Sequence, residues 1–136
     1  PMTIGLACSW DEVLFEKVYD VVAREMRARG GHQALTPIVD VARDPRWGRI
    51  EETYGEDPYL NSRLGAAQVR GLQGGSTGKV DNDHVLATLK HFAGHGETPG
   101  GLNRGTVNIA ERELREVHLY PFKHIIENAK PAAVMA

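Results

Sequence analysis

The chain has 136 residues, of which 41% are hydrophobic and 25% are charged, and its formal net charge is -2 at pH 7. This composition is typical of a globular protein and argues against a nucleic-acid-binding surface. The single cysteine, Cys8, excludes an internal disulfide framework, and the sequence contains no run that is apolar and long enough to span a membrane.

An amphipathic helix is predicted near the start of the chain. Ser9 and Glu12 have the spacing of an N-terminal capping box, and Gly30 ends the helical periodicity. An apolar strand over residues 34–41 follows, in which Pro37 is tolerated only near an end or a bulge. The predicted buried stripe of the helix consists of Val13, Leu14, Val18, Val21, Val22 and Met26.

The middle of the chain is predicted to form another helix and another strand. Asp57 and Pro58 are typical of a helix start, because they combine an N-cap with proline at the first helical position. The apolar run 85–89 is short and leads into a glycine-rich loop, so it is predicted as a buried strand. The predicted buried stripe of the helix consists of Leu60, Leu64, Ala67 and Leu72.

A helix over residues 111–128, which Pro121 should kink or restart, precedes a last strand over 132–136. The predicted order is strand, helix, strand, helix, strand, helix, strand. Strands that alternate with helices imply a parallel sheet with right-handed crossovers, here of about four strands. Periodicity alone does not distinguish a barrel from a doubly wound sheet.

Cationic side chains follow two of these strands where the strands end. Lys90 and His91 come directly after the run 85–89, and Arg49 closes a loop of charged residues that follows the strand 34–41. The carboxyl ends of parallel strands are where ligands bind in barrels and open sheets. We therefore expect Lys90, His91 and Arg49 to converge on one pocket.

The segments Val39–Arg49, Ile50–Pro58 and Lys90–Phe92 resemble the N-terminal barrel of glycoside hydrolase family 3, most closely its β-glucosidase and β-xylosidase branch. The resemblance covers nearly the whole chain. It implies an α/β fold in which residues 1–136 are a fragment, about half, of the family's (β/α)8 TIM-type catalytic barrel. The implied partners within the parent protein are the remainder of the barrel and C-terminal domains.

The resemblance also implies which residues bind substrate. In the family, the lysine and histidine of this motif and the arginine of the Trp-Gly-Arg turn bind sugar hydroxyls, and they correspond to Lys90, His91 and Arg49. Arg104 is a further candidate in the loop after the strand, and Trp47 either stacks on a sugar or anchors its own loop. The other charged residues near Arg49 are expected to form ion pairs or helix caps: Asp44, Arg46, Glu51, Glu52, Glu56 and Asp57.

The activity that the resemblance implies is that of a retaining β-glycosidase, which hydrolyses β-linked oligosaccharides or aryl glycosides of glucose or xylose through a covalent intermediate. Such enzymes use two carboxyl groups roughly 5–5.5 Å apart. We assign no catalytic residue within the chain, because the nucleophile is expected just beyond Ala136 and the acid/base in a later domain. The isolated chain is accordingly predicted to be inactive and, with open sheet edges, prone to self-association.

Two other functions stay open at this point. The chain could be a catalytically silent sugar-binding or structural half-barrel, or part of a β-N-acetylglucosaminidase of the same family. That enzyme has a similar Lys-His-Phe-x-Gly-His-Gly run, but its Asp-Ser-His signature does not follow Gly96 here.

The histidines do not have metal-ligand spacing, so we expect no metal or other cofactor. Neither nucleic acid nor a membrane is an expected partner, and the compartment is left open, although family members are often secreted or periplasmic.

Overall fold

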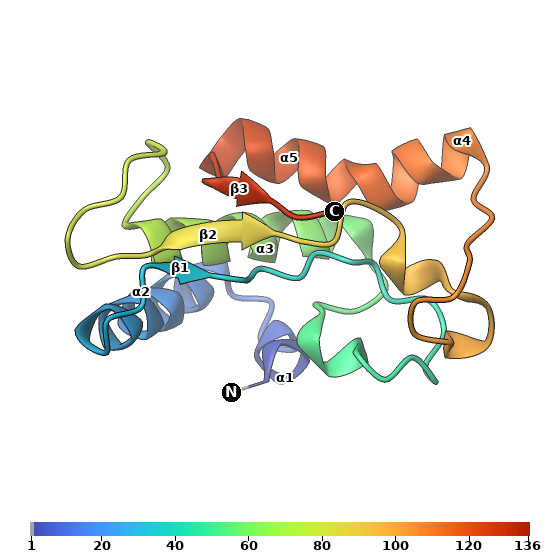
Figure 1. Ribbon diagram of the computed structural model, residues 1–136, viewed down its shortest axis with the longest axis horizontal. Helices are drawn as coiled ribbons and strands as arrows, with labels where there is room; N and C mark the ends of the chain where they lie inside the picture. The colour runs from blue at the N-terminus through green and yellow to red at the C-terminus, as the bar shows by residue number, and fades with distance from the viewer. Residues whose placement is uncertain (1) are drawn as a thin grey trace.

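A parallel sheet runs through the structure, a computed structural model that describes residues 2–136. Its strands are β1 (Gln33–Ala34), β2 (Leu86–Leu89) and β3 (Ala133–Val134), with β2 in the centre. Gln33 lies opposite Leu86, and Thr88 lies opposite Ala133. The three arrows point the same way in Figure 1, so their carboxyl ends meet at one edge of the sheet.

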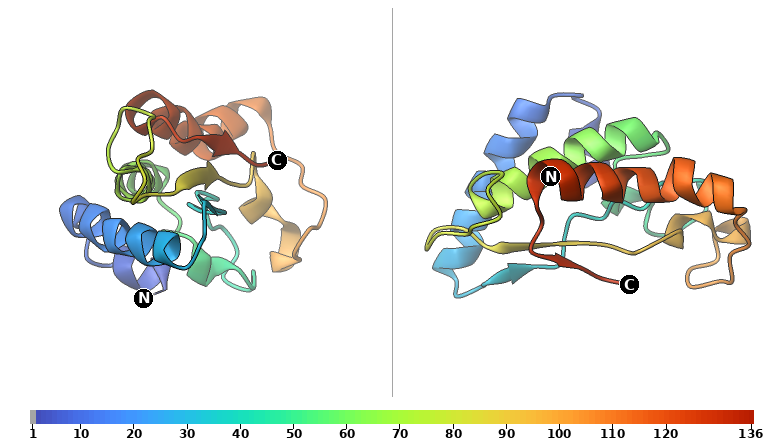
Figure 2. Two further views of the ribbon diagram at one scale, coloured as in Figure 1. Left: turned by 60° about the vertical axis from the view of Figure 1, so that its left-hand side comes forward. Right: turned by 90° about the horizontal axis from the view of Figure 1, so that it is seen from above.

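Three long helices lie side by side along one face of this sheet (Figure 2). They are α2 (Glu12–Ala28), α3 (Pro58–Gln73) and α5 (Leu119–Ala129), and α3 packs between the other two. The shorter helical segments are α1 (Thr3–Ala7), α4 (Glu111–Glu113), the 3-10 turns η1 (Ile50–Glu52), η2 (His95–Glu97) and η3 (Pro99–Gly101), and the π-helical segment η4 (Leu114–His118).

The hydrophobic core fills the space between α3, its two neighbouring helices and the sheet. Leu64, Ala67 and Leu72 of α3 are buried as predicted. Full burial of each of the two leucine side chains is worth about 1.5–3 kcal/mol. The other large contributors are Phe15 and Tyr19 of α2, Val39 and Leu89 of the sheet, and Phe122 and Ile125 of α5.

The α2 helix differs from the prediction in its cap and in its buried face. Asp11 is the N-cap and accepts a hydrogen bond from the Leu14 N–H at 2.9 Å, because the helix begins at Glu12 and Ser9 lies too far upstream. Four of the six predicted stripe residues, Val13, Leu14, Val21 and Val22, are exposed, whereas Phe15, Tyr19 and Ala23 are buried.

The reason for this different face is the close approach of α2 to α3. A Cβ atom at Gly71 of α3 would collide with the backbone oxygen of Glu16, so the two helices touch where α3 has no side chain. Arg63 and Arg70 of α3 then pair with Glu12 and Glu16 of α2, each at 2.8 Å. The face of α2 that carries these glutamates is therefore the face turned toward α3.

The predicted strand 34–41 is regular only over β1, although its pairing with β2 continues beyond it. The Lys90 N–H donates to the Pro37 carbonyl at 3.1 Å, and the Val39 N–H donates to the Lys90 carbonyl at 2.9 Å. Proline has no N–H to donate, so the ladder is interrupted at Pro37. The described chain also begins with helix α1 rather than with a strand, which leaves three strands in place of the expected four.

The predicted helix 111–128 contains the irregularity expected at Pro121. The segment is α-helical in α4 and α5 but π-helical over Leu114–His118, which ends three residues before this proline. Because a proline ring collides with the carbonyl of the residue four positions earlier in a regular helix, the wider π turn accommodates it.

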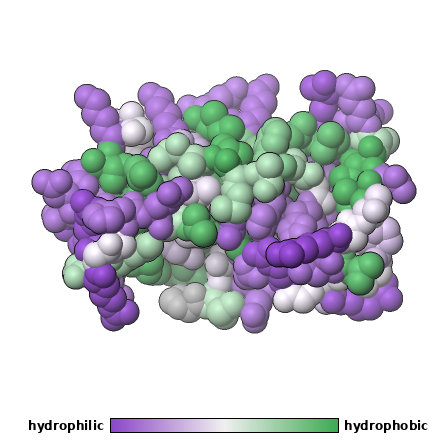
Figure 3. Space-filling view, in the orientation of Figure 1, coloured by the Kyte–Doolittle hydropathy of each residue, from purple (hydrophilic) through white to green (hydrophobic). Residues whose placement is uncertain are grey.

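The face of the sheet that the helices leave open carries apolar side chains. Figure 3, which has the orientation of Figure 1, shows apolar residues gathered over the strands. Leu35, Leu86 and Val134, on or beside the strands, are 54%, 39% and 45% exposed. Within residues 2–136, no helix has the length and hydropathy that a membrane span requires.

His84 joins α2 to the segment that enters β2. Its side chain is 5% exposed, and its two ring nitrogens lie 2.6 Å from Asp81 Oδ1 and 2.8 Å from Asp20 Oδ1. Burial disfavours the charged ring, but the bonds to Asp20 and Asp81 outweigh burial and raise the pKa of His84. Folding therefore favours the charged form of this ring between the two carboxylates.

We predict that this cluster makes stability depend on pH. A histidine whose pKa is raised by folding stabilises fully below its unfolded pKa, about 6.5, and loses that contribution as pH rises through the higher folded value. The loss of melting temperature caused by His84→Asn should therefore be larger at pH 6 than at pH 8.5, as measured by thermal denaturation.

The control for this measurement is His124→Asn on α5, outside the cluster, which should show no such difference. Equal losses for His84→Asn at the two pH values would mean that the ring contributes by packing alone.

Candidate functional site

Arg49 lies at the end of the loop that follows the β1 segment, immediately before η1. Its Nε donates to Glu52 Oε1 and its Nη2 donates to Glu52 Oε2, both at 2.7 Å. This bidentate geometry fixes the plane of the guanidinium. This bond with Arg49 lowers the pKa of Glu52 and raises that of Arg49. The Nη1 group does not take part in this pair, so its N–H bonds are directed elsewhere.

His91 lies two residues after the end of β2 and is oriented by Asp40, which lies between two buried valines. The Asp40 side chain is 0% exposed, and its Oδ2 atom accepts from His91 Nδ1 at 2.8 Å. The backbone N–H of His91 also donates to this carboxylate, at 3.2 Å. With Nδ1 as the donor, the Nε2 atom of His91 is free to accept from Arg49 Nη1, 3.3 Å away.

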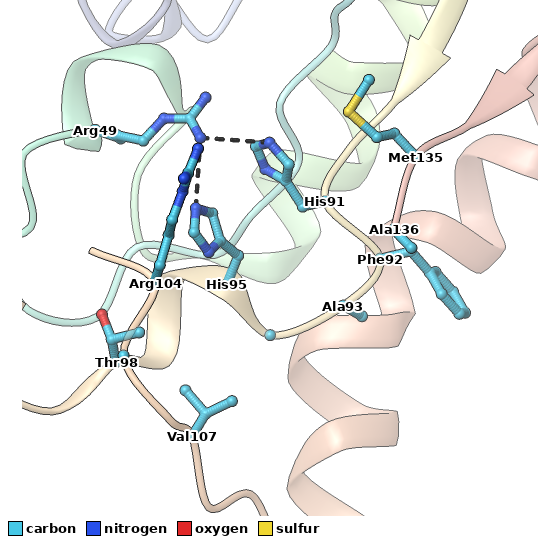
Figure 4. Close-up of a pocket in the computed structure, with 12 residues that line it drawn as sticks. Arg49, His91, Phe92, Ala93, His95, Thr98, Arg104, Val107, Met135 and Ala136 are labelled. Carbon is cyan, nitrogen blue, oxygen red and sulfur yellow. Dashed lines mark hydrogen bonds between the residues drawn. The ribbon is translucent and has the colours of Figure 1, made fainter. Parts of the chain in front are cut away.

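His95, at the start of η2, is the second imidazole at Arg49. Its Nε2 atom lies 3.4 Å from Arg49 Nη1, and its ring stands edge-on to those of His91 and Trp47. Burial, reinforced by repulsion from His91, Arg49 and Arg104, lowers the pKa of His95. A neutral imidazole can accept a hydrogen bond from the Arg49 N–H. Figure 4 shows both histidines bonded to the same guanidinium nitrogen, Arg49 Nη1.

These side chains line a cavity of about 470 Å³ at the carboxyl ends of the strands. Arg104 extends into the cavity toward Arg49 from the loop after η3 (Figure 4). The cavity wall therefore combines hydrogen-bond donors with apolar surface, which suits a neutral polyhydroxylated ligand. The lining residues also include Phe92, Thr98, Val107 and Met135.

Lys90 and Trp47 do not line this cavity. Lys90 is half-buried, and burial together with repulsion from Arg49 lowers the pKa of its ammonium group, which the charges of Glu52 and Asp40 partly offset. Trp47 is 2% exposed and its Nε1 donates to Asn103 at 3.4 Å. This burial favours the second of the two roles expected for Trp47, that of a loop anchor, and sugar stacking on Trp47 stays a prediction.

Sequence reasoning missed the role of Asp40 and undervalued His95. Asp40 was hidden because it lies inside a segment predicted as an apolar strand, Val39-Asp40-Val41. The available signal was the carboxylate itself, because a charge in a buried strand requires a partner. His95 had no sequence signal that placed it on Arg49, because its position depends on how the glycine-rich loop folds back.

Of the ion pairs and caps expected around Arg49, those of Asp44, Arg46, Glu52 and Asp57 are present, whereas Glu51 and Glu56 form no ion pair and no helix cap among residues 2–136. Asp44 binds Arg46 at 2.6 Å, and the hydrogen bonds from Arg46 lower the pKa of Asp44 to about 2. Asp57 caps α3 by accepting from the Leu60 N–H at 2.6 Å. Among residues 2–136, no carboxylate lines the cavity, and no group of three histidine, cysteine or acidic side chains is arranged to hold a metal ion.

Comparison with known proteins matches residues 1–136 to the family model described as Glycosyl hydrolase family 3 N terminal domain. A β-xylosidase of Formosa agariphila is 45% identical over 136 residues, which are 99% of this chain and 19% of that protein. A periplasmic β-glucosidase of Salmonella typhimurium is 36% identical over 136 residues, which are 100% of this chain and 18% of that protein.

A solved structure of a β-glucosidase from Listeria innocua in complex with glucose has a TM-score of 0.93 at 40% identity, covering 98% of this chain and 19% of that one. The expected partial α/β barrel is thereby confirmed. The chain spans 18% to 19% of the length of these proteins.

Proposed function

Because the chain belongs to glycosyl hydrolase family 3, we propose that it forms part of the catalytic barrel of a retaining β-glycosidase. The proposed substrates are β-linked glucosides or xylosides, in keeping with the β-xylosidase and β-glucosidases to which the chain is similar. The observation that carries the proposal is the shared contact of Arg49 with His91 and His95 at the cavity.

In this proposal the chain supplies sugar binding. A hydroxyl group accepts from cationic donors and donates to acceptors, and hydrogen bonds to charged groups are the stronger ones. Arg49 and Arg104 would donate from the cavity wall, while the Asp40–His91 pair fixes the ring against which Arg49 rests. Lys90, whose ammonium group lies near enough to Arg49, Glu52 and Asp40 to interact with their charges, is proposed as a further hydroxyl donor. The two carboxyl groups that hydrolysis with retention requires come from other parts of the parent enzyme.

The test is hydrolysis by the parent enzyme of an aryl β-glucoside and an aryl β-xyloside. We expect turnover of at least one, with the β-anomer of the sugar as the first product seen by proton NMR, because a covalent intermediate gives net retention. An α-anomer as first product would contradict the retaining mechanism. Faster cleavage of an aryl N-acetyl-β-glucosaminide would indicate the other enzyme class, and no turnover by the folded protein would indicate the silent module.

A further inference from the structure

A second cluster of charged side chains surrounds Glu97, a residue of the η2 turn in the glycine-rich loop. The Oε2 atom of Glu97 is 3.1 Å from Arg43 Nε and 3.2 Å from His118 Nε2. Neither contact has the geometry of a hydrogen bond, so the attraction between Glu97 and Arg43 is mainly electrostatic. Arg43 also reaches Glu113 at 3.4 Å. The cluster therefore ties the η2 turn to the segment after β1 and to the helix that precedes β3.

His118 is presented to Glu97 by the π-helical segment, of which it is the last residue. Its side chain is 1% exposed, and burial lowers its pKa, which favours the neutral ring despite the neighbouring carboxylate. The ring packs against the Glu97 carboxylate, with 3.2 Å between His118 Nε2 and Glu97 Oε2. The π turn thus places a buried imidazole where it meets the loop.

The same loop is packed tightly on its other side. A Cβ atom at Gly96 would collide with the Val41 carbonyl, and one at Gly101 would collide with the backbone of Trp47. Glu97 lies between these two glycines. Because the segment is short and tightly packed, contacts that hold Glu97 in place also restrict the neighbouring residues of the loop. His95, two residues before Glu97 in the same turn, faces the cavity and Arg49.

We propose that Glu97 is a positioning residue: held by Arg43 and His118, it fixes the η2 turn so that His95 is set against Arg49 at the sugar-binding cavity. This inference rests on the proposed function for its catalytic consequence. The position of the His95 ring relative to Arg49, by contrast, can be tested by a measurement that does not depend on enzyme activity.

The first measurement is the NMR titration of His95 in the parent enzyme and in its Glu97→Ala variant. Release of the turn should expose the ring and move it away from Arg49, so the pKa of His95 should rise toward its ordinary value. Loss of the carboxylate charge by itself would lower that pKa. The direction of the shift therefore separates repositioning from a direct charge effect, and an unchanged or lowered pKa would overturn the proposal.

The second measurement is kcat/KM on the aryl glycoside that the parent enzyme cleaves. Glu97→Ala should lower it at least about tenfold, mostly through KM, because small displacements of a binding group are costly. In a His95→Ala background the same change should have no further effect. Equal losses in both backgrounds would show that Glu97 does not act through His95. Glu97→Gln keeps the size of the side chain but removes the charge that attracts Arg43, so it should recover little of the activity.

The matched control is Glu16→Ala, which breaks an ion pair of similar exposure, Arg70–Glu16, between α2 and α3. Glu16→Ala should lower the melting temperature but leave the pKa of His95 unchanged. If Glu97→Ala does not fold, Glu97→Gln removes the same charge without creating a cavity and gives the same comparison of directions. If the wild-type enzyme cleaves none of the glycosides, the proposed function fails and the titration alone decides this inference.

Discussion

Replacing Arg49 with alanine in the parent enzyme should lower kcat/KM for an aryl β-glucoside or β-xyloside by about tenfold to a hundredfold. The guanidinium is the group on which Glu52, His91 and His95 converge, and it lines the cavity. A hydrogen bond to a charged group is worth about 1.5–3 kcal/mol, which corresponds to this range in rate. Initial-rate kinetics over a range of substrate concentrations would measure it.

Arg46→Ala is the matched control, because Arg46 lies in the same loop but is 72% exposed and binds only Asp44 among the acidic groups described. It should leave the kinetics unchanged. Arg49→Lys should recover little activity, since a lysine cannot reproduce the bidentate bond with Glu52. If Arg49→Ala and Arg46→Ala have the same kcat/KM, Arg49 does not contribute to substrate binding.

Replacing Asp40 with asparagine should reduce both activity and stability. The buried carboxylate accepts from the Nδ1 atom and the backbone N–H of His91, and an asparagine amide would turn a donor toward one of these donors. A buried donor left without an acceptor costs about 1–3 kcal/mol. We therefore expect a lower melting temperature and, because the His91 ring is no longer held against Arg49, a fall in kcat/KM of about tenfold or more.

The two effects of Asp40→Asn can be separated by comparison with His91→Ala. If Asp40 acts on activity through His91, adding Asp40→Asn to His91→Ala should lower kcat/KM no further. Asp44→Asn, which removes a carboxylate from the neighbouring loop, should leave kcat/KM unchanged. A melting temperature for Asp40→Asn equal to that of the wild type would contradict the buried hydrogen bonds.

The sequence by itself determined the features that depend on neighbouring residues. The alternation of strands and helices follows from local periodicity, and the start of α3 at Pro58 follows from the cap Asp57 beside it. The pairing of Arg46 with Asp44 is equally local, because the two residues are two positions apart. Lys90, His91 and Arg49 could be proposed because strand ends in a parallel sheet meet at one edge.

Only the tertiary structure decided which groups touch across the fold. The buried face of α2 is set by the close approach at Gly71 of another helix, so the apolar stripe chosen from α2 alone was wrong. Asp40 and His91 are 51 residues apart, and Arg49 and His95 are 46 apart, so their contacts arise from strand register and from the return of the glycine-rich loop. Whether Trp47 faces solvent or packs inside is decided in the same way, because burial depends on segments that lie far away along the chain.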